Sequence, residues 1–268
     1  PKNNSAVVER VLNSGSIMLG KTNVSELGLV GNCENSLGLE GFNPWDISKT
    51  PGGSSGGAAA AVAAGLTPIA TGSDGGGSIR IPSNFCGVYG IKPTFGRVSA
   101  YTGVNSETPN FGSQNGPIAR TVKDAALLLQ IMSGYDSRDH FSLRETPPNF
   151  IKSLDKNIKG LKIAFSKDFG FAKVNSEVID VVSNAANIFE NLGCHVEELN
   201  LNLHNPYETF GAISDFHFYQ NFNKYLDKYE GQLTDFVKFG IEKGSRVKLV
   251  EYSKAINNIY KQRSIIND

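Results

Sequence analysis

Residues 51–82 read PGGSSGGAAAAVAAGLTPIATGSDGGGSIRIP, and this stretch decides how the rest of the chain is interpreted. Two glycine-rich turns, residues 52–57 and 74–78, contain serines and flank a short apolar segment. Ordering a glycine costs conformational entropy, so a glycine cluster indicates backbone angles or a close ligand approach that only glycine allows. A nucleophilic serine beside an oxyanion hole of backbone N–H groups needs both properties. The stretch therefore favours serine-based catalysis.

The composition is that of a globular α/β protein with one large domain or two small ones. The chain has 268 residues, 40% of them hydrophobic, and a formal net charge of zero. It lacks the excess of positive charge that is typical of a protein that binds nucleic acid or an anionic membrane directly. No apolar run reaches the ~18–20 residues of a membrane-spanning helix. The three cysteines have no metal-ligand spacing, so we expect them to be reduced in a cytoplasmic protein.

Hydrophobic periodicity predicts alternating helices and strands. Helices are expected at residues 5–12, 56–64 and, after a capping box of Thr121 with Asp124, 122–132. Ser54 or Ser55 would cap the second of these helices. Strands are expected at residues 16–20, 66–70 and 88–91. A polar linker at 136–159 precedes a parallel β-α-β unit formed by residues 161–165, 176–192 and 195–201, and residues 206–268 are mostly helical.

Two short motifs suggest other chemistry. Residues 15–22, GSIMLGKT, fit the phosphate-binding pattern G-x-x-x-x-G-K-[ST], but a helix precedes them and apolar side chains fill the loop. Ser54 and Ser55 fit the nucleophile elbow G-x-S-x-G, which requires a strand directly before it and a histidine partner. Neither context is evident in the sequence. The alternative to a phosphate-binding loop is a buried strand that ends at a turn. The alternative to a nucleophile elbow is that the histidines serve no catalytic purpose.

Ser78 is the better candidate nucleophile on local grounds. It follows three glycines, whose successive N–H groups can point at one spot, and it precedes Arg80 by two residues. A purely structural turn is the alternative, although one or two glycines normally suffice for that. Asp74 is expected to cap this turn or to pair with Arg80 rather than to act as an acid or base.

A longer pattern surrounds these serines. It comprises GKTN at residues 20–23, NPWD at 43–46, PGGSSGG at 51–57, GSDGGGSIRIP at 72–82 and GIKPT at 90–94. Together these segments resemble the amidase signature family, densely over residues 15–135 and more loosely over the β-α-β unit. The resemblance implies a single α/β domain over residues 1–268, with a mixed β-sheet core flanked by helices on both faces. It also implies that the domain is truncated, since the chain opens on Pro1 and closes directly after a helical pattern.

The resemblance assigns the residues of the site. Ser78 matches the nucleophile, and Ser54 matches a bridging serine that follows a cis peptide bond to Gly53. The N–H groups of Gly75, Gly76, Gly77 and Ser78 would form the oxyanion hole, although many relatives carry threonine at the first of these positions. Ser55, Asp74 and Arg80 would support the turns. No metal and no organic cofactor is implied.

The same resemblance exposes a missing part. Members of the family use a lysine as general base, farther upstream of the bridging serine than the 53 residues before Ser54. Lys21 and Lys49 do not match that motif. We therefore expect this chain to lack its base and to be inactive by itself, because a bridging serine without a lysine cannot export the proton of Ser78 efficiently.

The resemblance implies hydrolysis of a carbon–nitrogen amide bond in a small-molecule substrate, giving a carboxylate and ammonia or an amine. One alternative is the amidase component (the A subunit) of a tRNA-dependent amidotransferase, in which partner subunits carry the tRNA contacts. Another is a non-catalytic binding module. A homodimer or association with amidotransferase subunits is expected, and direct binding of nucleic acid or membrane is not.

Overall fold

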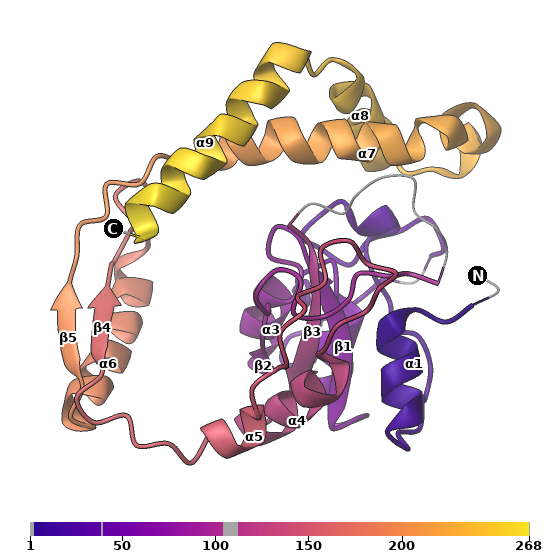
Figure 1. The fold of residues 1–268 in the computed structure, drawn as a ribbon. Coiled ribbons are helices and arrows are strands. Elements are labelled where there is room, and N and C mark those ends of the chain that lie inside the picture. Colours follow the sequence, from indigo (N-terminus) through magenta and orange to yellow (C-terminus); the bar gives the residue numbers. More distant parts are fainter. Residues whose placement is uncertain (1–2, 39, 104–111, 268) are drawn as a thin grey trace. The chain divides into compact units, whose positions relative to one another are not determined.

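The computed structural model describes residues 3–38, 40–103 and 112–267 (Figure 1). The chain forms two compact units, the first made of Pro1–Asp155 and Asn221–Ile241 and the second of Lys156–Gln220 and Glu242–Asp268. The expectation of a single domain stays a prediction. Among the described residues, the helices are too short or too polar to cross a lipid bilayer.

A three-stranded antiparallel sheet lies at the centre of the first unit. The strand order is β1-β3-β2, with β1 at Ile69–Asp74, β2 at Tyr89–Gly90 and β3 at Gln114–Ala119. Ile69 pairs with Ala119, and the register continues to Asp74 opposite Gln114. The middle strand was not predicted, because its sequence QNGPIA contains the strand-disfavouring residues Gly116 and Pro117.

Helices cover both faces of this sheet, so the predicted mixed α/β architecture is confirmed. On one face α2 (Gly56–Ala63) and α3 (Arg80–Cys86) bury Ala59, Val62 and Cys86 against Ile118 of β3. On the other face α1 (Ala6–Asn13) and α4 (Val122–Met132) enclose a second apolar cluster with Ile69 of β1. Ala70 belongs to the first cluster and Ile69 to the second, as the alternation of side chains along a strand requires.

Local sequence signals explain most helix ends. The Ser5 hydroxyl accepts the Val8 N–H before α1, and the Thr121 hydroxyl accepts the Asp124 N–H before α4, as the capping box predicts. Helix α3 was missed, because its residues RIPSNFC carry a proline and no apolar periodicity. The short helices Glu26–Gly28 (η1) and Phe150–Ser153 (α5) complete this unit up to Asp155.

The strand expected at residues 16–20 is wrong. These residues have no regular secondary structure, and Ile17 and Leu19 are 86% and 75% exposed. An apolar run becomes a strand only when a neighbouring strand pairs with it, and none of the described strands lies beside this run.

The second unit contains the predicted β-α-β arrangement. Strand β4 (Lys162–Phe165) pairs in parallel with β5 (His195–Glu198), and α6 (Ser176–Asn191) connects them. Helix α6 ends before Gly193, which has a φ of 85°. The predicted helical segment is confirmed as α7, η2, α8 and α9 at Tyr207–Tyr229, Glu230–Gln232, Asp235–Ser245 and Leu249–Asn267.

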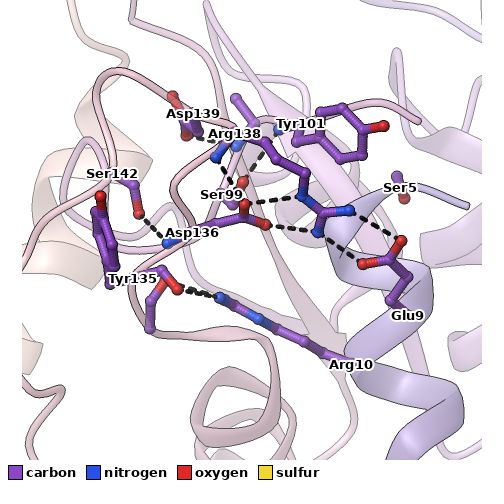
Figure 2. Close-up of polar contacts among 12 residues, drawn as sticks. Ser5, Glu9, Arg10, Ser99, Tyr101, Tyr135, Asp136, Arg138, Asp139 and Ser142 are labelled. Atoms are coloured by element: carbon purple, nitrogen blue, oxygen red, sulfur yellow. Dashed lines mark hydrogen bonds and ion pairs between the residues drawn. The ribbon is translucent and has the colours of Figure 1, made fainter. Parts of the chain in front are cut away.

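An arginine network ties α1 to the loop after α4 (Figure 2). The Arg138 guanidinium donates to Asp136 at 2.8 and 2.9 Å and to both carboxylate oxygens of Glu9, and it lies 4.1 Å from the centre of the Tyr101 ring. Arg10 donates to main-chain carbonyls of the same loop, including that of Gly134. The hydrogen bonds from Arg138 hold the pKa of the Asp136 carboxyl below its ordinary value.

Replacing Arg138 with Met should lower the melting temperature at pH 7 and make unfolding less sensitive to acid. Because the folded-state pKa of Asp136 is lowered, its stabilising contribution is present above the ordinary pKa of ~3.9 and is lost as the pH falls through the folded value. Thermal unfolding from pH 7 to pH 3 should therefore show the gap between wild type and Arg138→Met shrinking below pH ~4. The control is Lys123→Met on the exposed side of α4, and a gap independent of pH would contradict the network.

Candidate active site

The two glycine–serine turns lie against each other in the first unit. Ser78 follows β1 and precedes α3, whereas Ser54 and Ser55 directly precede α2. The N–H of Ser55 donates to the carbonyl of Ser78 at 3.2 Å. The Ser55 hydroxyl donates to the carbonyl of Ser73 and accepts its N–H, at 3.3 and 3.2 Å. Ser55 therefore fastens the first turn to the strand that carries the second.

This use of the Ser55 side chain corrects one expectation. Ser55 does occupy the N-cap position of α2, but its hydroxyl makes no capping bond to that helix. The hydroxyl is committed to β1 instead, because the turn lies within hydrogen-bond reach of Ser73. Ser55 is thus a positioning residue between the two turns.

The first turn depends on the absence of side chains at two glycines. The peptide bond Gly53–Ser54 is cis, as the family resemblance implied. A Cβ on Gly53 would lie 1.9 Å from the carbonyl oxygen of Asn32, and one on Gly57 would lie 2.5 Å from the backbone of Asn23. The N–H of Gly57 donates to the carbonyl of Asn23 at 3.0 Å. Only glycine allows the loop of residues 23–32 to approach the serine turn so closely.

Asp74 organises the second turn. Its fully buried carboxylate accepts the N–H groups of Gly77, Ile79 and Arg80 at 2.8, 3.1 and 3.2 Å. The Arg80 guanidinium adds two hydrogen bonds at 2.8 and 2.9 Å. Asp74 therefore both caps the turn and pairs with Arg80, two roles that the sequence left as alternatives.

The charge of Asp74 is stable in this setting. Burial by itself would raise the pKa of the carboxyl, but hydrogen bonds from the Arg80 side chain and from the backbone of Arg80 and Ile79 outweigh burial and hold the pKa below its ordinary value. A group that stays ionised and fully bonded is a poor proton carrier. The environment of Asp74 thus suits a structural role.

Most of the candidate reactive groups of the two turns make no hydrogen bond within the described residues. No hydrogen bond within the described residues engages the hydroxyl of Ser54, which is 6% exposed, or the hydroxyl of the half-buried Ser78. The N–H groups of Gly75, Gly76 and Ser78 also have no hydrogen-bond acceptor among those residues. The N–H of Gly77 differs from the expectation, because it already donates to Asp74.

Lys92, which interacts electrostatically with Asp74 and Arg80, was not singled out by the sequence pattern. Burial and the positive charge of Arg80 lower the pKa of Lys92, while Asp74 acts in the opposite direction. Its Nζ donates to the carbonyl of Pro93 at 2.7 Å. The signal that could have pointed to it is the GIKPT segment, which belongs to the long pattern around the serines.

The two short motifs do not have the context that their chemistry needs. Residues 15–22 follow α1 rather than a strand, and no helix begins at their end within residues 23–38 apart from the short η1 turn. Residues 47–53, which precede Ser54, form no strand. The phosphate-binding and nucleophile-elbow interpretations therefore lose the strand-loop-helix geometry on which they depend.

Replacing Asp74 with Asn should destabilise the first unit by about 2–4 kcal/mol. The amide has one acceptor oxygen where the carboxylate has two, so buried N–H groups lose their partner and Arg80 loses its counter-charge. Denaturant unfolding measures the change, with the exposed Asp155→Asn as control. Equal stability of the two variants would contradict the organising role of Asp74.

Replacing Gly53 with Ala should abolish the native turn, because the new methyl group would overlap the carbonyl of Asn32. Gly20→Ala is the matched control, since a Cβ there meets no atom within 4 Å and the φ of Gly20 lies outside the left-handed region. Thermal unfolding and amide hydrogen exchange over residues 51–57 report the difference. Tolerance of both changes would show that the close approach is not needed.

Curated relatives share much of this chain's sequence. The A subunit of glutamyl-tRNA(Gln) amidotransferase from Alkaliphilus metalliredigens (strain QYMF) is 44% identical over 202 residues, covering 75% of this chain and 41% of that protein. Its counterpart from Chromohalobacter salexigens is 46% identical over 197 residues, covering 74% and 40%. The chain thus spans about two-fifths of the length of the curated relatives it matches.

Among solved structures, a bacterial aryl acylamidase of the amidase signature enzymes superposes with a TM-score of 0.88 at 31% identity, covering 98% of this chain and 56% of that one. The A subunit of the Thermotoga maritima glutamyl-tRNA(Gln) amidotransferase superposes with a TM-score of 0.71 at 28% identity, covering 97% and 56%. The family model described as Amidase matches residues 1–266. By its serine turns, its fold and this match over nearly its whole length, the chain belongs to the amidase family.

Proposed function

We propose that this chain carries the nucleophilic half of an enzyme that hydrolyses carbon–nitrogen amide bonds. The observation that carries the proposal is the set of hydrogen bonds by which Ser55 joins the first turn to Ser73 and Ser78. It holds the uncommitted hydroxyls of Ser54 and Ser78 on adjoining segments, beside N–H groups that have no other acceptor within the described residues. Membership of the amidase family supports the same chemistry.

In this mechanism the Ser78 hydroxyl attacks the amide carbonyl, and Ser54 passes its proton to a neutral lysine. The tetrahedral oxyanion is stabilised by the N–H groups of Gly75, Gly76 and Ser78, each worth about 2.7–4 kcal/mol when aimed at the developing charge. Gly77 supports the turn through its bond to Asp74. The leaving amine takes the proton back through Ser54, and water then cleaves the acyl-enzyme.

The lysine base belongs to this proposal, and no lysine among the described residues is assigned to it. Within the described residues no lysine makes a hydrogen bond to Ser54 or Ser78, and the Lys92 Nζ is engaged by Pro93. We therefore expect turnover by this chain to be far below that of an enzyme with a complete triad. Full amidase activity of the isolated chain would contradict the assignment.

A second function is favoured by the curated relatives, which are named as components of a glutamyl-tRNA(Gln) amidotransferase. The same serines would then release ammonia for a partner protein instead of discharging it to water. Co-purification with such a partner, and ammonia release from glutamine only in its presence, would favour this function. Amide hydrolysis by a protein that purifies without a partner would favour a free amidase.

A fluorophosphonate probe should label Ser78, and Ser78→Ala should abolish the labelling. Ser54→Ala should slow labelling by about 10²–10⁴-fold, because the proton of Ser78 then lacks its relay. The measurement is peptide mapping of the adduct in the longest natural form of the protein, with the exposed Ser36→Ala as control. Absence of labelling in every form would contradict serine catalysis and favour a non-catalytic binding module.

A further inference from the structure

Ser113 lies directly before β3, beside the turn that carries Ser78. Strand β1 ends at Asp74, which pairs with Gln114, the first residue of β3. Gly75 follows β1 and Ser113 precedes β3, so both residues leave the sheet at the same end. The antiparallel pairing therefore brings Ser113 to the start of the proposed oxyanion turn, although the serine chemistry assigns it no role.

The side chain of Ser113 faces this turn. A Cβ on Gly75 would lie 3.4 Å from the Cβ of Ser113 and 3.6 Å from its Oγ, and the nearest heavy atoms to that position all belong to Ser113. Because Gly75 has no side chain, the Ser113 hydroxyl borders the first residue of the turn directly.

The backbone around Ser113 is held by its neighbours. The Ser113 carbonyl accepts the side-chain amide of Gln114 at 2.9 Å, and Gln114 is fully buried. The Oε1 of Gln114 accepts the N–H of Val98 at 3.5 Å, and the side-chain amide of Asn115 donates to the carbonyl of Ser99 at 3.4 Å. The position of Ser113 is thus fixed before any ligand binds, which is what a residue that contacts a reacting group requires.

The free hydrogen-bonding groups at this end of the turn are donors. The N–H groups of Gly75 and Gly76 have no acceptor among the described residues, and no hydrogen bond among them engages the hydroxyl of the half-buried Ser113. The carboxylate of Asp74 is already occupied by other partners. Because polar groups withdrawn from water normally have a partner, a ligand at this point is expected to supply an acceptor oxygen.

We propose that the Ser113 hydroxyl donates a hydrogen bond to the acceptor oxygen bound at the oxyanion turn. In the proposed reaction this oxygen is first the oxyanion of the tetrahedral intermediate and finally a carboxylate oxygen of the product. A side-chain donor thereby supplements the main-chain donors and replaces the N–H of Gly77, which Asp74 holds. The role in catalysis rests on the proposed function, whereas binding of an anion at the turn requires no catalytic step.

Binding of a tetrahedral anion tests the contact without any chemical step. The probe is ethylphosphonate, measured by ligand-observed NMR with a Ser78→Ala parent that forms no covalent adduct. Adding Ser113→Ala should weaken binding by about tenfold or more, the effect of losing one hydrogen bond to a charged acceptor. Ser113→Thr keeps the hydroxyl and should bind like the parent, as should the matched control Ser36→Ala at an exposed serine.

A rescue variant separates a hydrogen bond from a packing effect. In the Ser113→Ala protein, Gly75→Ser would return a hydroxyl to the same place, because a Cβ on Gly75 lies 3.6 Å from the Oγ of Ser113 and the φ of Gly75 lies outside the left-handed region. This double variant should regain most of the lost binding, whereas Gly75→Ala in the same background should not. Equal behaviour of the two double variants would contradict the hydrogen bond and leave Ser113 a packing residue.

The same variants with Ser78 intact report whether the contact serves the reaction. Fluorophosphonate labelling of Ser78, in the longest natural form of the protein, should slow by about tenfold or more in Ser113→Ala and recover in the Gly75→Ser double variant. Equal ethylphosphonate binding with and without the Ser113 hydroxyl, or no binding to the parent, would overturn the role of Ser113. Absence of labelling in every form, with Ser113-dependent binding retained, would contradict only the catalytic proposal.

Discussion

The buried carboxylate of Asp74 is the group on which the arrangement of the site depends. A turn of three successive glycines has little conformational preference of its own, and the entropy of ordering it must be offset by specific contacts. Asp74 supplies those contacts, because it accepts three main-chain N–H groups of the turn and two bonds from Arg80. The turn is thereby fixed before any substrate arrives, which is the condition for an effective oxyanion hole.

The second constraint is steric and acts between segments. The loop of residues 23–32 approaches the first serine turn so closely that Gly53 and Gly57 admit no side chain. The same loop contains Gly28, where a Cβ would lie 3.7 Å from the Oγ of Ser54. One short loop therefore packs against both the backbone of the first serine turn and the Ser54 hydroxyl, although it carries none of the proposed reacting atoms itself.

The two functional candidates make different demands on this architecture. The serine turns serve a free amidase and an amidotransferase component equally well, because both begin with attack on an amide carbonyl. What separates them is the fate of the released ammonia or amine, which passes to a partner protein in one case and to water in the other. The curated relatives are named as amidotransferase A subunits, whereas one of the similar solved structures is an aryl acylamidase.

Much of the fold was predictable wherever the signal was local. The helical spacing of apolar residues marked α1, and the capping box at Thr121 marked the start of α4. An apolar run, an amphipathic segment and an alternating run marked the β-α-β unit. Strand β3 and helix α3 were missed, because Gly116, Pro117 and Pro82 oppose the structures that they occupy. Residues 16–20 were wrongly assigned to a strand, since pairing depends on a neighbouring segment that composition does not reveal.

The sequence by itself determined which residues are the candidates for the chemistry of this protein. The glycine–serine pattern over residues 51–82 is a local property, and through its resemblance to the amidase signature family it pointed to Ser54, Ser78 and the oxyanion turn as candidates without any coordinates. Only the tertiary structure decided how these parts are used. In the structure the Ser55 hydroxyl bonds to β1 and the N–H of Gly77 donates to Asp74. Leu27 lies beside the C-terminal part of α7. These contacts are made between residues that are far apart in the chain, or between groups that compete for one partner. They therefore depend on tertiary packing rather than on local spacing.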